Sequence, residues 1–314
     1  MLRLVGRRLL NAIPLLLIVS FAVFVLVDLA PGDVAVNVAG EGATPERIAE
    51  VRRELGLDDP LVERYGRWAG NAVQGDLGTS LTTNENVWSM IADRLSITFS
   101  LILVSMVIAT GVALVAGIGA ALKPRGMVDR LVSIGSSLAV AAPPFWIGLI
   151  LVLLFAVERS WFPAVGYAPL SEGLWEWLRH LILPGIALAG VPAAELARQL
   201  RGSLVDVMDR DYVLTARAKG LTRASIVGKH ALKNAAIPVI TVLGFRLAQL
   251  FGGTVVVERV FNIQGIGSLA VNAVLERDIP VVLGITVFTT VVVILVNVLV
   301  DASYGYFNPK VRTA

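Results

Sequence analysis

Cysteine is absent from this chain of 314 residues, and charged residues are scarce. Without cysteine the chain can form neither a disulfide framework nor a thiolate metal site, and the redox compartment stays open. Only 16% of the residues are Asp, Glu, Lys or Arg, whereas 56% are hydrophobic and the mean hydropathy is +0.75. A soluble domain carries about 25% charged residues. The composition therefore excludes a soluble globular fold and indicates an integral membrane protein.

A nucleotide-binding motif is also absent from the sequence. A phosphate-binding loop needs Gly, four residues, then Gly, Lys and Ser or Thr. The nearest candidate, Gly228-Lys229-His230, has Arg223 at the first glycine position and no hydroxyl after the lysine. The two histidines and the carboxylates show no metal-ligand spacing, and no Ser, His and Asp arrangement is typical of a hydrolase. We therefore predict a chain that is not an enzyme and that binds no cofactor, ATP or metal itself.

Long uncharged runs predict an all-α, polytopic protein with six transmembrane helices, because about 20 residues cross a bilayer core. The fourth run is short, contains Pro184 and Pro192, and has to include polar residues toward Gln199 to cross. This divides the chain into residues 1–29 (N-terminus and first span), 30–96 and 97–314 (five further spans). The predicted spans are 9–27, 97–122, 131–157, 181–194, 237–257 and 281–300.

The charges between the spans predict the orientation of the chain. Arg3, Arg7 and Arg8 precede the first span, and the loop 195–235 carries eight basic residues against four acidic ones. Segment 30–96 instead carries eleven acidic and six basic residues. By the positive-inside rule, both termini and the loop 195–235 are expected to be cytoplasmic.

Segment 30–96 is too long and too regular to be a simple connector, and we predict that it folds into helices. Thr44 and Gly56 can begin and end a first helix, and Asp59-Pro60 repeats the start signal for a second. Apolar residues at helical spacing mark the second and a third helix: Leu61, Tyr65, Trp68 and Ala72, then Val87, Ile91 and Leu95. These faces can pack on each other and on the outer membrane face, or form a docking platform for a substrate-delivery protein.

Ionisable residues are nearly absent from the predicted spans. A transporter driven by protons or sodium needs carboxylates or histidines along its path, but Asp28 and Asp301 lie at span ends and both histidines, His180 and His230, lie in loops or at span edges. This weighs against an ion-driven secondary transporter. Only Arg246 lies near a span centre. It can line a water-filled route and meet a carboxylate such as a peptide C-terminus, or it can pair with a neighbouring subunit or snorkel to an interface.

The basic loop 195–235 has the pattern of two short helices. Asp211 is expected to cap a helix over 212–219, with Gly220 in the left-handed position after its end. A second helix is expected to start at Thr222 and to end before Pro238. Such a short exposed helix suits a groove in a partner protein, although simple positive-inside anchoring also explains the charge.

These residues resemble a known family, the membrane permease subunits of ABC importers, and within it the dipeptide and oligopeptide (DppB/OppB-like) branch. Asp211-Tyr212-Val213 is followed by Thr-Ala-Arg-Ala-Lys-Gly-Leu over 215–221 and by His230-Ala231-Leu232 with Asn234. The sequence departs from the family pattern at Leu214, Lys233 and Gln264. Further matches are spread over nearly the whole chain: Leu29-Ala30-Pro31-Gly32-Asp33, Leu55-Gly56-Leu57, Gly75-Asp76-Leu77-Gly78, Pro144-Phe145-Trp146, Leu183-Pro184-Gly185, Gly252-Gly253, Glu258, Phe261, Asn297, Val300-Asp301 and Asn308-Pro309-Lys310.

The resemblance implies a type I importer permease of the bacterial cytoplasmic membrane that forms a heterodimer with a homologous second permease. Two cytoplasmic ATPases would bind ATP and Mg, an extracytoplasmic binding protein would deliver the substrate to segment 30–96, and no nucleic acid is implied. Relatives in this branch handle dipeptides, longer peptides, glutathione, haem or nickel. The residues expected to couple to the ATPases are Asp211, Tyr212, Thr215, Ala216, Arg217, Ala218, Lys219, Gly220 and Leu221. On the residues alone, a passive channel or scaffold without an ATPase stays an alternative.

Overall fold

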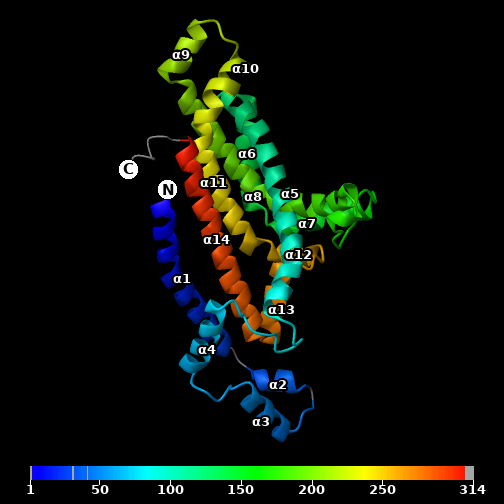
Figure 1. Cartoon of the computed structure of the whole chain (residues 1–314). Helices are drawn as coiled ribbons and strands as arrows, with labels where there is room; N and C mark the ends of the chain where they lie inside the picture. The colour runs from blue at the N-terminus through cyan, green and yellow to red at the C-terminus, as the bar shows by residue number, and fades with distance from the viewer. Residues whose placement is uncertain (1, 30–31, 41, 308–314) are drawn as a thin grey trace. The chain divides into compact units, whose positions relative to one another are not determined.

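The computed structural model describes residues 2–29, 32–40 and 42–307 (Figure 1). Ala30, Pro31 and the Asn308-Pro309-Lys310 match lie outside the described residues. Within the described ranges the regular structure is helical apart from one isolated bridge between Thr79 and Asn86, which confirms the all-α prediction. The chain separates into two compact units, one of Leu2–Thr98 with Gln264–Ile294 and one of Phe99–Ile263 with Leu295–Ala314.

Five helical stretches in the described residues are long and apolar enough to cross a membrane. The predicted fourth span is confirmed as a single helix of 35 residues, α8, although it contains Pro184 and Pro192. Proline is tolerated in membrane helices because neighbouring helices and side chains satisfy the backbone groups that it leaves free. The five are α1 (Leu2–Leu29), α5 (Val87–Leu122), α8 (Leu174–Met208), the stretch Arg223–Gly253 that contains α11 (Leu232–Gly253), and α14 (Ile279–Phe307).

The predicted third span, residues 131–157, is wrong as one continuous helix. It consists of α6 (Met127–Ala141) and α7 (Pro144–Leu151), with α7 continuing into the π-helix η1 (Val152–Val157), and the two parts meet at an angle of 100°. Ala142 and Pro143 between them have extended ψ angles of 123° and 137°. Proline lacks the backbone N–H and pushes the preceding residue out of the helical region, so two adjacent prolines end the helix. The six predicted spans are therefore five helices, or six if the bent pair is one span.

The helices between α1 and α5 belong to the unit of Leu2–Thr98 and Gln264–Ile294. Thr44 caps the first predicted helix, since its hydroxyl accepts a hydrogen bond from the Arg47 N–H at 3.4 Å, and Gly56 has the left-handed φ of +61° at its end. The expected cap at Asp59 is wrong, because its carboxylate accepts from Arg67 at 2.6 Å and Pro60 takes the cap position. The elements are α2 (Val34–Ala39), α3 (Pro45–Glu54) and α4 (Leu61–Val73), with α13 (Ile266–Glu276) in the same unit.

The apolar stripe of α4 is packed, as its spacing predicted. Leu61, Tyr65 and Trp68 lie against the buried side chains of Phe24, Ile279 and Leu283. The ring centres of Tyr65 and Phe24 are 5.7 Å apart in an edge-to-face arrangement, and the Trp68 indole N–H donates to the Leu77 carbonyl at 3.3 Å. The stripe therefore stabilises this unit by burying aromatic surface against α1 and α14.

Helix α8 is the central helix of the other unit and packs against α6, α7 and α11 (Figure 1). Small residues also allow α5 to approach α8 closely. A Cβ on Gly117 of α5 would lie 3.0 Å from the Ala197 carbonyl of α8, and a Cβ on Gly185 would lie 3.0 Å from Val104. Close backbone approach at small residues is the usual way in which membrane helices pack.

Candidate functional site

The short helix predicted over residues 212–219 is present as α9 (Asp211–Ala218), which lies with α10 (Arg223–Ser225) at one end of its unit (Figure 1). Arg210 occupies the cap position with an extended backbone, φ −78° and ψ 147°, and no side chain caps the helix. The expected cap at Asp211 is therefore wrong by one residue, because Asp211 is already the first helical residue. Its carboxylate still lies in the first turn, where the helix dipole favours negative charge.

The end of α9 is the glycine turn that the sequence predicted. Gly220 has a φ of +79°, and its N–H donates to the Arg217 carbonyl at 2.9 Å, while the Leu221 N–H donates to the Ala216 carbonyl at 3.3 Å. This pair of bonds is a Schellman motif, which requires a left-handed residue after the helix. No heavy atom lies within 4 Å of the place where a Cβ on Gly220 would stand. The need for glycine is therefore conformational and not steric.

The segment after α9 forms a continuous helical path into the fifth predicted span. The Thr222 hydroxyl accepts from the Ser225 N–H at 3.4 Å, which confirms the predicted second start. The chain then runs through α10, the π-helix η3 (Ile226–Ala231) and α11. The expected end before Pro238 is wrong, because Pro238 lies inside α11, where a membrane helix tolerates it.

The nine predicted coupling residues lie together on α9 and its turn, and all except Ala216 are exposed. Val213 and Ala216 are buried in an apolar cluster with Leu204, Met208 and Ile226. A hydrogen bond from the Asn234 amide to the Tyr212 hydroxyl at 2.9 Å also joins α9 to the start of α11. The helix thus has one anchored side and one side open to a partner.

Arg246, the ionisable residue that the sequence placed near a span centre, forms an ion pair with Glu195 of α8. The Arg246 Nε and Nη2 donate to the two oxygens of the Glu195 carboxylate, and Nη1 donates to the Gln249 side-chain oxygen at 2.5 Å. The Phe245 ring centre lies 5.8 Å from the guanidinium carbon. The pairing partner is therefore in this chain.

The prediction that the spans contain no carboxylate near their centres is wrong, because Glu195 lies inside α8. The uncharged run of the fourth span ends at residue 194, and the span was expected to include polar residues toward Gln199. Helix α8 continues to Met208, so Glu195 lies within it. Residues 195–208 of the expected loop 195–235 are thus helical. The predicted extension of the fourth span toward Gln199 already contains Glu195, but the contact of Glu195 with Arg246, 51 residues away, is tertiary.

A second ion pair that the sequence did not indicate joins α6 to α8. Arg201 donates to Asp129 through Nε at 3.0 Å and Nη2 at 2.7 Å, and the Arg125 backbone N–H donates to the same carboxylate at 2.7 Å. The Asp129 side chain is 8% exposed and that of Arg201 35%. Such a two-pronged guanidinium–carboxylate contact fixes the relative position of the two helices.

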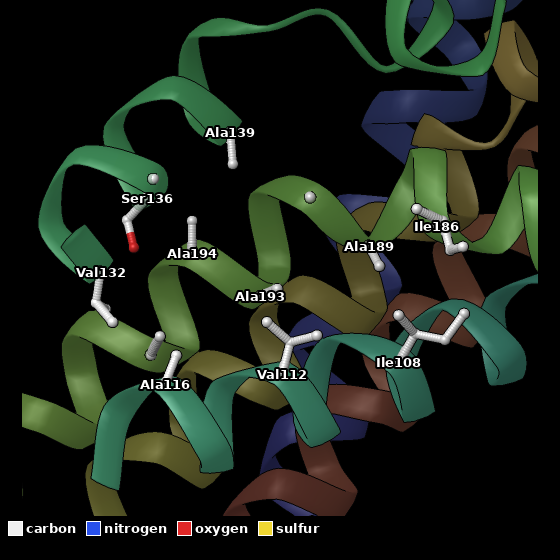
Figure 2. Close-up of a pocket in the computed structure, with 13 residues that line it drawn as sticks. Ile108, Val112, Ala116, Val132, Ser136, Ala139, Ile186, Ala189, Ala193 and Ala194 are labelled. Atoms are coloured by element: carbon white, nitrogen blue, oxygen red, sulfur yellow. The ribbon is translucent and has the colours of Figure 1, made fainter. Parts of the chain in front are cut away.

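An apolar pocket of about 300 Å³ lies between α5, α6 and α8 (Figure 2). Its lining includes Ile108 and Val112 of α5, Val132 and Ser136 of α6, and alanines of α8. The Ser136 hydroxyl is its polar side-chain group, so the pocket has the chemistry to hold hydrocarbon and not a charged substrate. Among the described residues no group of three or more His, Asp or Glu could hold a metal ion.

Two models of one family of transport proteins together match most of the chain. Residues 1–102 match the family model described as "Binding-prot-dependent transport system membrane comp, N-term", and residues 113–313 match "Binding-protein-dependent transport system inner membrane component". The chain belongs to this family of inner-membrane permeases. It is thus a polytopic, all-helical permease subunit of an ABC transport system. ATP is bound by the partner ATPases, and this subunit is not itself catalytic.

Curated relatives of this permease match it from end to end. A putative peptide transport system permease protein of Brucella abortus is 41% identical over 309 residues, which are 98% of both chains. A probable peptide ABC transporter permease protein of Sinorhizobium fredii is 38% identical over 306 residues, also 98% of both. The glutathione transport system permease protein of Escherichia coli K12 is 41% identical over 312 residues, 99% of both.

Proposed function

We propose that this permease is one half of the translocation pathway of an ATP-driven importer of di- and oligopeptides and pairs with a homologous second permease. The observation that carries the proposal is the exposed segment from Asp211 to Leu221, which is anchored on one side and ends in a Schellman turn. Relatives at 38–41% identity that are described as peptide permeases support the substrate class.

In this proposal α9 is the coupling helix and lies in a groove of a cytoplasmic ATPase. An amphipathic helix in a groove binds by apolar contacts, and Leu214, which is 49% exposed, offers such a contact beside Tyr212, which is 44% exposed. The two ATPases bind ATP and Mg, and closure of the ATPases moves α9. The permease then shifts between two conformations in favour of the one that ATP stabilises.

The charge pattern supports the orientation. Both termini and the α9 loop are cytoplasmic in this proposal, and residues 30–96 lie outside, where α2, α3 and α4 face an extracytoplasmic binding protein. The type I arrangement has six spans, with the bent pair α6 and α7 as the third.

A glutathione importer is the second candidate. The relative from Escherichia coli K12, described as a glutathione permease, is 41% identical over 99% of both chains. Glutathione is itself a small peptide. It carries two free carboxylates and one ammonium, so the two candidates differ in substrate charge as well as in size and linkage.

Purification of the tagged permease from its own membranes tests both candidates. A second permease and two ATPases should purify with it, and ATP hydrolysis should be measured with di- to hexapeptides and with glutathione. Hydrolysis stimulated by peptides supports the first candidate, and stimulation by glutathione alone supports the second. A chain that purifies alone, under conditions that preserve other membrane complexes, would contradict the proposed function.

A further inference from the structure

We propose that Glu195 and Arg246 form a binding site for the charged ends of a peptide within the translocation pathway. Arg246 binds the terminal carboxylate and Glu195 binds the terminal ammonium. This inference rests on the proposed function and names the substrate groups that the pathway recognises.

The pair is accessible although it lies on two candidate spans. The side chain of Arg246 is 20% exposed and that of Glu195 is 25% exposed, so neither is sealed inside the protein. All three guanidinium nitrogens of Arg246 face acceptors, two on Glu195 and one on Gln249. A peptide carboxylate has the same two-oxygen geometry as Glu195 and can take its place on the guanidinium fork.

The exposed face of α11 next to the pair carries polar groups as well as an aromatic ring. Thr241, Phe245 and Gln249 are exposed and follow each other at four-residue spacing, so they lie on one face of the helix. Gln249 contacts the guanidinium directly, and Phe245 provides apolar surface beside it. Polar and ionisable groups at membrane depth face a protein interior or a water-filled cavity, which favours a route for a polar substrate along this face.

The pairing of opposite charges explains how an empty site stays stable. A lone charge on a membrane helix is costly, and Glu195 neutralises Arg246 when no substrate is bound. A dipeptide with free ends carries one positive and one negative end group close together, as the contact between Glu195 and Arg246 requires. It can therefore exchange with both partners without leaving an unpaired charge on either helix. A substrate with one blocked end cannot do so.

Direct binding to the purified complex tests this site. Labelled peptides with free ends, with an amidated C-terminus or with an acetylated N-terminus are measured by equilibrium dialysis without the binding protein, so that its selectivity does not contribute. The unmodified complex should bind the free peptide about 10- to 100-fold more tightly than either blocked form, as expected for loss of a charge-assisted hydrogen bond. R246Q should lose the discrimination against the amide, and E195Q should lose the discrimination against the acetylated form.

A matched control comes from the other ion pair. R201Q removes a guanidinium that contacts Asp129 and should leave the preference for free ends unchanged. If a single variant fails to assemble, the double variant E195Q/R246Q, which leaves no unpaired charge, is measured and should lose both preferences. Retention of the native preferences in these variants, or an unmodified complex that binds free and blocked peptides equally, would overturn the site. An unmodified complex without associated ATPases would instead contradict the proposed function.

Discussion

Replacing Gly220 with Val should uncouple transport from ATP hydrolysis. Gly220 has a φ of +79° and closes the Schellman turn through its N–H to the Arg217 carbonyl. A β-branched residue is a rare outlier at positive φ, so valine would disfavour the turn that presents α9.

The size of this effect follows from the surroundings of Gly220. Because no atom lies within 4 Å of the added Cβ, no steric clash contributes. The remaining cost is that of a left-handed residue with a side chain, about 1–2 kcal/mol and higher for valine than for alanine. One or two kcal/mol corresponds to a factor of roughly 5–30 in an equilibrium. The equilibrium constant for ordering the α9 terminus should fall by that factor.

The assay is peptide uptake into proteoliposomes that contain the assembled complex, measured together with ATP hydrolysis. G220V should lower uptake per ATP hydrolysed, and G220N should be less affected because asparagine tolerates the left-handed region. Gly228 provides the control: it lies in η3, has no positive φ, and an added Cβ meets no atom within 4 Å. G228A should therefore behave like the native chain. Native uptake and native ATPase association in G220V would refute the coupling assignment.

Three further substitutions test the packing of the membrane helices and the anchoring of α9. G244A places a Cβ 1.9 Å from Cγ2 of Val300, so the melting temperature in detergent should fall by the equivalent of about 1–3 kcal/mol and recover in G244A/V300A; an unchanged single variant would contradict this contact. D129A leaves the guanidinium of Arg201 without its carboxylate, so it should destabilise the permease by about 1–3 kcal/mol in the same melting experiment. The double variant D129A/R201Q should lose less stability, and equal losses in the two variants would exclude a contribution from the ion pair. Y212F removes the hydroxyl that anchors α9 to α11, so it should weaken this attachment by about 0.5–1.5 kcal/mol and lower coupled uptake with assembly intact. A loss of assembly would instead assign the residue a packing role.

Much of the helical structure could be predicted because it depends on local signals. Thr44, Gly56 and Gly220 act through backbone geometry within a few residues, and the structure confirms all three. The break between α6 and α7 was missed, although the prolines at 143 and 144 are visible in the sequence. Hydropathy reports whether a segment avoids water and does not report its direction, so an uncharged bent pair has the same profile as one span.

The residues of the candidate site also fall into two groups, those that local sequence signals predict and those that only tertiary contacts bring together. The segment from Asp211 to Leu221 could be identified because its motif is contiguous in the sequence. Arg246 could be singled out by its cost in a membrane helix, but its partner could not, since Glu195 is 51 residues away and belongs to another helix. Asp129 and Arg201 lay among ordinary loop and span-end charges, and only the packing of α6 on α8 pairs them.

The positions of α9 and of the Glu195–Arg246 pair suggest how one acts on the other. Helix α9 follows α8 after two residues and is joined to α11 through the Tyr212 hydrogen bond and the helical path from Thr222. These are the two helices that carry Glu195 and Arg246. A displacement of α9 by an ATPase would therefore reach both sides of the ion pair.

Spin labels can measure this coupling directly, because the chain has no native cysteine. Arg198 of α8 and Thr241 of α11 are exposed and lie within five residues of Glu195 and Arg246 along their helices, so cysteines at these two positions can be labelled in an otherwise native permease. The distance distribution between the labels should change when the assembled complex binds ATP, and the change should be reduced in G220V. If ATP leaves the distribution unchanged while uptake continues, the relative movement of α8 and α11 is not the step that transmits the energy, and the peptide site has to respond by another route.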